Sequence, residues 1–235
     1  MAAPQLDPAA ERLLPEATHR LIRTADGLDD ADYIQATGLP GWTRAHVLAH
    51  LALNAEGLTG ALRGVVEGTR VPMYASQEAR DADIAALARM EPSAIRSRLL
   101  GGCTDLAAAL DAIPPDQADT TADRVPGGRV FKLSTAPGMR LSEVEIHHAD
   151  LGAGYGPEQW SPEFTCLMLD RMLARGGATS SFQAHAVDLG RTWSSGDGGP
   201  VVAGPGFALA WWLTGRGHGE GLTSEGGELP QIGAW

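Results

Sequence analysis

Apolar side chains recur at helical spacing along four long segments of the chain, and this pattern constrains the fold more than any other feature. The segments are about 8–27, 43–68, 91–113 and 140–152, with a shorter helix expected at 76–90. Successive helices joined by short connections favour an up-and-down bundle, whose core is a usual place for metal sites built from facing helices. We therefore predict a helical bundle for the N-terminal part of the chain.

The last long segment carries a carboxylate and an imidazole at a spacing that suits a metal half-site. Glu143 and His147 are four residues apart, so they lie on one face of a helix, beside an apolar face that can pack into the bundle. Gly152 is expected to end this helix, because glycine adopts the left-handed conformation found there. Taken alone, the same pair also fits a solvated ion pair on a helix surface.

A third candidate ligand lies inside the apolar stripe of the second long segment. Thr43 is expected to cap this helix, and His50 falls on its buried face, where an imidazole needs a partner for its nitrogens. The partner is either a backbone carbonyl or a metal ion shared with Glu143 and His147. Two histidines and one carboxylate leave a coordination position open, as in catalytic zinc sites. His46, one helical turn earlier, is the alternative ligand.

The neighbours of the predicted ligands have other expected roles. His148 points about 100 degrees away from His147 and is expected to pack or to support the site from behind. Asp150 is expected to cap the helix or to orient a ligand, with direct ligation as the less favoured alternative. His185 and His218 have no partners in the sequence and are expected at the surface.

Four segments, in this order, resemble the mycothiol-dependent maleylpyruvate isomerase family. They are 41–55, 71–84, the Glu143 helix with its Asp150-Leu-Gly end, and Gly215-Arg216-Gly217. Because they span nearly the whole chain, the resemblance is specific. It implies a DinB-like helical bundle that binds zinc through His50, Glu143 and His147, and a smaller C-terminal domain that covers the site.

The resemblance also implies mycothiol as the cofactor and the cis-to-trans isomerisation of maleylpyruvate to fumarylpyruvate, a step in gentisate-type aromatic degradation. Reversible addition of a thiolate makes the conjugated double bond single, so that it rotates before the thiol leaves. A zinc ion with an open position provides the thiolate, because a coordinated thiol is deprotonated. Arg216 matches the family's catalytic arginine, and its planar fork suits a substrate carboxylate; the alternative is a solvated residue at a helix C-terminus.

Beyond residue 153 the sequence pattern changes from long helices to short mixed elements. After a glycine-rich linker we expect a helix at about 161–175, strands near 182–188, 192–193 and 200–202, and a helix at about 206–214. The predicted fold class is therefore mixed, α + α/β. It consists of a DinB-like four-helix bundle at 1–153 and a small α+β domain at 160–235.

Composition and charge exclude several classes of partner. The formal net charge is -11, from 18 basic and 29 acidic side chains, which argues against nucleic acid as a ligand. The start of the chain lacks the basic region of a secretory signal, and no apolar run approaches the length of a membrane span. We expect a cytoplasmic protein, most simply a monomer, that acts on small molecules.

The two cysteines are expected to be reduced thiols without a catalytic role. Cys103 and Cys166 are far apart in the sequence and show no zinc-type spacing, so thiol chemistry requires an external low-molecular-weight thiol. Two other functions stay open at this point. One is a mycothiol S-transferase that uses the same metal and thiol on another electrophile, and the other is a non-catalytic metal-binding module.

Overall fold

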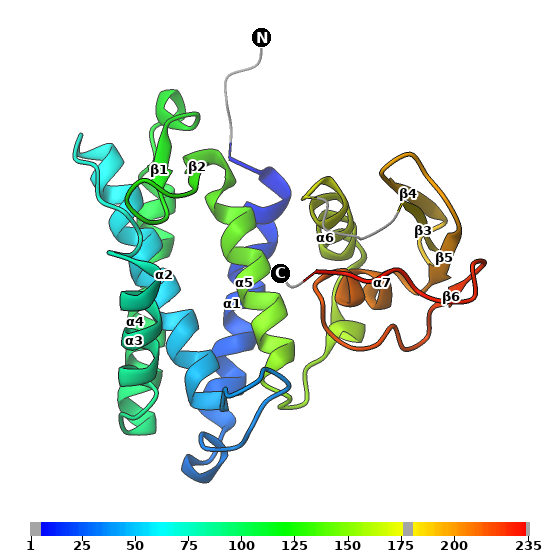
Figure 1. Ribbon diagram of the computed structural model, residues 1–235. Helices are drawn as coiled ribbons and strands as arrows, with labels where there is room; N and C mark the ends of the chain where they lie inside the picture. Colours follow the sequence, from blue (N-terminus) through cyan, green and yellow to red (C-terminus); the bar gives the residue numbers. More distant parts are fainter. Residues whose placement is uncertain (1–5, 176–180, 234–235) are drawn as a thin grey trace. The chain divides into compact units, whose positions relative to one another are not determined.

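The computed structural model describes residues 6–175 and 181–233 and confirms the mixed fold class, with helices in the N-terminal part and a sheet in the C-terminal part (Figure 1). Contacts within the chain divide it into two units, Met1–Tyr155 and Gly156–Trp235.

The first unit contains the four predicted long helices and the shorter one. They are α1 (Pro8–Gly27), α2 (Arg44–Val66), α3 (Gln77–Leu87), α4 (Pro92–Asp111) and α5 (Ala136–Asp150). The most extensive packing joins α2 to α4 and α1 to α5, while α2 also contacts α5, so the four long helices form a bundle. Helix α5 begins earlier than predicted because Pro137, in its first turn, does not interrupt the helical hydrogen bonds.

Local signals in the sequence fix several helix ends. The Asp7 side chain accepts hydrogen bonds from the backbone at the start of α1, and Ser76 Oγ accepts one of 3.1 Å from Ala79 N at the start of α3. Gly152 has a φ of 59° just after α5, as predicted for a residue that ends a helix. The Gly101-Gly102 pair lies inside α4, where a Cβ on Gly102 would come within 3.2 Å of the Ala52 carbonyl oxygen. Close packing of α4 against α2 therefore depends on Gly102.

A hairpin leads from α4 to α5 and holds the segment between α2 and α3. Strands β1 (Thr121–Asp123) and β2 (Val130–Lys132) pair in the antiparallel sense around a turn that contains Gly127 and Gly128. Along the other side of β1, Met73 N donates to Asp123 O at 2.9 Å and Tyr74 N donates to Arg124 O at 3.0 Å. These bonds fix the backbone that carries Tyr74 and leads into α3.

The second unit combines two helices with a four-stranded sheet. Its elements are α6 (Pro162–Arg175), β3 (Phe182–Ala186), β4 (Arg191–Ser195), β5 (Val201–Gly204), α7 (Gly206–Leu213) and β6 (Thr223–Ser224). The strand order is β4-β3-β5-β6, with β3 and β5 parallel and the other pairs antiparallel. The first three strands and both helices were predicted. Strand β6 was not, because two residues are too few to show an alternating pattern.

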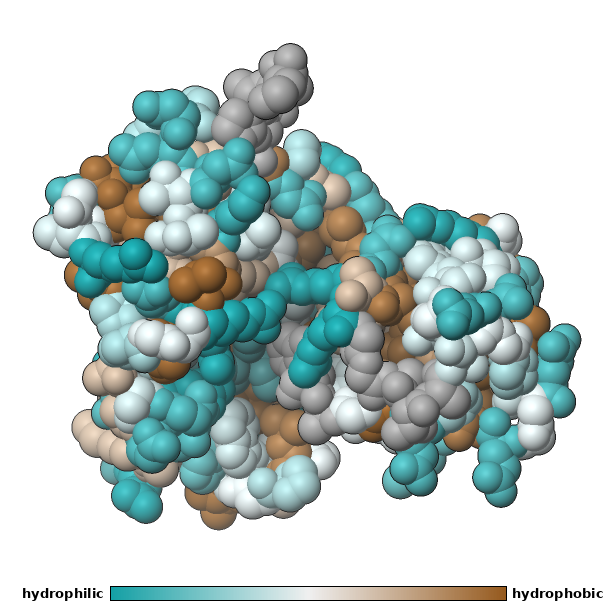
Figure 2. Space-filling model, turned by 45° about the horizontal axis from the view of Figure 1, so that its top comes forward, coloured by the Kyte–Doolittle hydropathy of each residue, from teal (hydrophilic) through white to brown (hydrophobic). Residues whose placement is uncertain are grey.

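On the face seen in Figure 2, apolar residues of the first unit lie in separate small groups among hydrophilic ones. Large apolar side chains that are exposed in the described residues are also scattered in the sequence: Ile34, Val71, Met90, Leu100, Val130 and Val187. Scattered exposed apolar side chains of this kind are normal for a globular surface. Among the described helices, none has both the length and the apolar character needed to cross a bilayer.

Candidate metal centre

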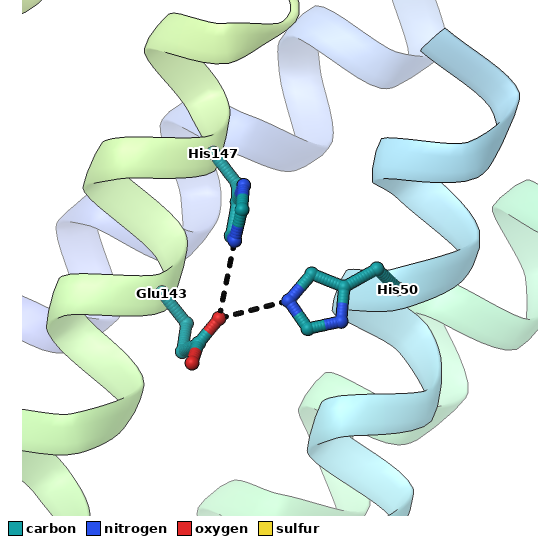
Figure 3. Close-up of side chains that lie close together, drawn as sticks. All are labelled: His50, Glu143 and His147. Carbon is teal, nitrogen blue, oxygen red and sulfur yellow. Dashed lines mark hydrogen bonds and ion pairs between the residues drawn. The ribbon is translucent and has the colours of Figure 1, made fainter. Parts of the chain in front are cut away.

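The three predicted ligands meet between α2 and α5 (Figure 3). Glu143 Oε2 lies 2.9 Å from His50 Nε2 and 3.3 Å from His147 Nε2. The ligand atoms of the three side chains all lie within 4.8 Å of one another, and no other group of this kind occurs in the described parts of the chain. The structure therefore brings His50, Glu143 and His147 into one place although 93 positions separate His50 from Glu143.

The surroundings bury the imidazoles and leave the carboxylate partly accessible. The exposed fraction is 3% for His50 and 6% for His147, whereas the Glu143 side chain is 24% exposed. The Trp42 ring lies beside both histidines, with centroid distances of 5.6 Å to His50 and 6.4 Å to His147. Of the three side chains, the carboxylate is thus the most accessible to solvent.

Burial and hydrogen bonding shift the pKa values of the three groups in different directions. Burial lowers the pKa of His50 to about 4, so this imidazole is neutral at neutral pH. Burial alone would raise the pKa of Glu143, but hydrogen bonds from His147 and His50 outweigh it and hold that pKa well below its ordinary value. Burial would likewise lower the pKa of His147, but hydrogen bonds to Asp150 and Glu143 raise it. Of the two imidazoles, His147 therefore holds a proton more strongly, and a metal ion would compete with that proton.

Asp150 lies behind His147 and not among the ligands. Its Oδ2 is 2.8 Å from His147 Nδ1. A carboxylate on Nδ1 holds a ring proton on that nitrogen and orients the ring so that Nε2 faces Glu143 and His50. The structure thus gives Asp150 the orienting position that the sequence suggested.

We expect Asp150→Ala to weaken zinc binding about 10- to 100-fold, because loss of such a partner frees the imidazole to rotate and lowers its basicity. Titration of the metal-free protein with zinc by calorimetry measures the effect. Asp105→Ala is the matched control, since Asp105 is an exposed carboxylate on α4 whose partner is Arg63. Equal zinc affinity in both variants would remove Asp150 from the site.

The other histidines near the site have different partners. His46 Nδ1 lies 2.8 Å from Thr43 Oγ1 and accepts from Thr43 N at 3.3 Å, so it belongs to the N-terminal cap of α2. His148 lies 2.8 Å from Thr24 Oγ1 and stacks on Tyr155 with a centroid distance of 3.9 Å. The prediction that His148 packs beside the site agrees with these contacts.

One residue of the centre was missed in the sequence. Arg80, on α3, places its Nη2 3.1 Å from His50 Nδ1, and its guanidinium lies 5.7 Å from the centroid of the Tyr74 ring. No spacing rule connects positions 50 and 80, because the contact depends on how the segment before α3 returns along α2. The only available signal was that Arg80 falls within the 71–84 segment that resembles the isomerase family.

Arg216 follows α7 in the second unit. Its guanidinium lies 5.6 Å from the centroid of the Trp211 ring, and Nη1 donates to Thr214 O at 3.3 Å. Its expected role toward a substrate carboxylate stays a prediction. Cys103 is buried and Cys166 is half-buried, and both are free thiols as predicted.

The fold and this group of side chains define a class of protein: a helical bundle with a candidate metal site built from two imidazoles and one carboxylate on two of its long helices. The family model described as the mycothiol maleylpyruvate isomerase N-terminal domain matches residues 14–152. The chain therefore belongs to this family.

Two solved structures are similar to the chain over nearly its whole length. One is the crystal structure of the mycothiol-dependent maleylpyruvate isomerase, with a TM-score of 0.85, 26% sequence identity, and coverage of 96% of this chain and 95% of that chain. The other, a histidine-to-alanine mutant of the mycothiol-dependent maleylpyruvate isomerase, has a TM-score of 0.86 and the same identity and coverage. Comparison with curated protein sequences gives no significant match.

Proposed function

We propose that this protein catalyses the mycothiol-dependent, zinc-assisted isomerisation of maleylpyruvate to fumarylpyruvate. The observation that carries the proposal is the convergence of His50, Glu143 and His147 in a member of this isomerase family. The similar solved structures support the choice of reaction, because they are of an enzyme named for it and match this chain almost from end to end. Such a reaction would belong to gentisate-type aromatic degradation.

The residues present fit a zinc ion. Two imidazole nitrogens and a carboxylate oxygen are a usual zinc ligand set, and three protein ligands leave a position for a further ligand. The pKa directions agree, since they keep His50 neutral and Glu143 ionised. When bound, zinc would lower the pKa of a coordinated thiol so that mycothiol reacts as a thiolate near neutral pH.

The chain's own residues then have separate tasks. His50, Glu143 and His147 would hold the metal, and Asp150 keeps the His147 ring in the ligating orientation. The Trp42 ring, which lies beside both imidazoles, would limit the access of water from that side. Arg216 would hold a carboxylate of the substrate and stabilise the negative charge that develops when the thiolate adds to the double bond.

An assay with catalytic amounts of mycothiol tests this function. Zinc-loaded protein should consume maleylpyruvate and form fumarylpyruvate, while the thiol is recovered unchanged. Consumption of one thiol per substrate into a stable adduct would instead identify a mycothiol S-transferase. Zinc binding without any thiol-dependent turnover would identify a non-catalytic metal-binding module.

We expect the Cys103→Ser, Cys166→Ser double variant to stay within about twofold of the wild-type rate when mycothiol is supplied, since neither thiol lies among the proposed ligands. Serine nearly preserves the volume of cysteine, so packing around Cys103 changes little. Steady-state rates with and without mycothiol measure the effect. Turnover by the thiol-free wild type that disappears in the double variant would mean that the nucleophile is one of the protein's own cysteines.

A further inference from the structure

The two imidazoles of the site are held by partners of opposite charge. His147 Nδ1 faces a carboxylate, Asp150 Oδ2, at 2.8 Å. His50 Nδ1 faces a guanidinium, Arg80 Nη2, at 3.1 Å. A ligating histidine almost always donates its second ring N–H to an acceptor, so the partner of His50 is unusual.

The partner of His50 decides which ring nitrogen carries the proton. A guanidinium only donates, so Nδ1 of His50 must accept from Arg80, and the proton of the neutral ring is on Nε2. Nε2 then donates to Glu143 Oε2 at 2.9 Å. In this arrangement, the lone pair that a metal ion requires points at Arg80 and away from Glu143 and His147.

A metal bond at His50 Nε2 and the hydrogen bond from Arg80 are therefore mutually exclusive. With a metal on Nε2, the ring proton of the neutral imidazole moves to Nδ1. The N–H groups of His50 Nδ1 and Arg80 Nη2 would then face each other at 3.1 Å, where a hydrogen bond now joins the two nitrogens. Such a pair is repulsive and leaves the Nδ1–H of the buried His50 ring without an acceptor. Arg80 must turn away for the metal to bind.

The surroundings of Arg80 allow this movement. Its side chain is 13% exposed, Nη1 bonds to Asp81 Oδ1 at the surface, and Nε is buried without a hydrogen-bond partner. The side chain also lines a cavity of about 300 Å³ together with Tyr74 and Gly57. The guanidinium thus has donors to offer and free space beside it.

We propose that Arg80 has two roles, one without zinc and one with zinc bound. It competes with zinc for His50, and when zinc displaces it, its guanidinium binds a carboxylate of the substrate. The second half of the proposal rests on the proposed function. The negative charges of Glu143 and Asp150 together balance the charge of a divalent cation. A bound thiolate and a substrate with two carboxylates would therefore leave the site strongly negative. A planar guanidinium that binds a carboxylate with two hydrogen bonds meets this need at one end of such a substrate.

Zinc titration by calorimetry tests the competition without any assay of turnover. Arg80→Ala should bind zinc on the order of 10-fold more tightly than wild type, because the competing charge-assisted hydrogen bond is gone. Arg80→Gln should bind at least as tightly as Arg80→Ala, because its amide oxygen can accept from Nδ1–H of the ligating ring. Near-ultraviolet circular dichroism verifies that each variant keeps the wild-type fold.

Arg124→Ala is the matched control. The Arg124 guanidinium lies 5.8 Å from the centroid of the same Tyr74 ring, but it donates to Gln77 and not to His50. If removal of a nearby positive charge were the cause, both alanine variants would gain zinc affinity equally. Equal gains, or an unchanged affinity in Arg80→Ala, would overturn the competition between Arg80 and zinc.

Binding of maleate, a cis-dicarboxylate, to the zinc-loaded proteins tests the second half. We expect affinity to fall on the order of 10-fold in Arg80→Ala and to stay unchanged in Arg124→Ala. Unchanged maleate affinity in Arg80→Ala would overturn the anion-binding role, for example because the displaced guanidinium pairs with Asp83 in the cavity. Zinc and maleate binding as expected, but without isomerisation, would overturn the proposed reaction and leave the role of Arg80 intact.

Discussion

The His50→Ala variant should contain no stoichiometric zinc and show no thiol-dependent turnover, whereas the wild-type protein should contain one zinc ion per chain. The variant keeps only Glu143 and His147, and two protein ligands are fewer than the three that hold zinc in catalytic sites. We expect a loss of zinc affinity of ~1000-fold or more, since each ligand bond contributes several kcal/mol to such a site. Elemental analysis of both proteins after identical purification measures this.

His46→Ala provides the matched control, because it removes an imidazole from the same helix one turn earlier. His46 is engaged with Thr43, so this variant should keep its zinc and lose at most some stability of the α2 N-terminus. Stoichiometric zinc in His50→Ala, together with loss of zinc in His46→Ala, would move the site to the other histidine.

Arg216→Ala and Arg216→Lys should both keep zinc and the fold yet lose most of the isomerisation activity. A guanidinium that binds one carboxylate while the central bond of the substrate turns contributes to binding and to the addition step alike. Loss of such a charge-assisted contact typically costs roughly 1.5 to 3 kcal/mol, hence on the order of 10- to 150-fold in kcat/KM. Lysine should substitute poorly, because an ammonium group cannot form the planar fork.

Arg191→Ala is a suitable control for this second experiment. Arg191 lies in the same unit and also rests on a tryptophan, 4.4 Å from the centroid of the Trp193 ring, but it is paired with Asp170. Initial rates over a range of maleylpyruvate concentrations separate kcat from KM for each variant. An Arg216→Ala variant as fast as Arg191→Ala would contradict the role given to Arg216.

The helices could be predicted from the sequence because their signals are local. Capping residues, apolar periodicity and terminal glycines act within one or two turns, and they predicted the bundle helices closely. The proposed ligands followed the same logic, since Glu143 and His147 are four residues apart and His50 interrupts an apolar stripe.

Contacts that depend on tertiary structure could not be predicted in this way. Arg80 reaches His50 only because backbone pairing of Met73 and Tyr74 with the β-hairpin fixes where α3 begins. Nothing within a few residues of Arg80 reports that pairing. The sequence therefore predicted the candidate ligands but not the group that competes for one of them.

The separation of the ligands along the chain has a thermodynamic consequence. A metal ion held by His50 on α2 and by Glu143 and His147 on α5 joins residues 93 positions apart, as a cross-link would. The unfolded chain does not present these ligands together, so free zinc at about a thousand times its Kd would stabilise the folded state by about 4 kcal/mol through mass action. We therefore expect substitutions that loosen α2 from α5 to weaken zinc retention as well as to destabilise the fold.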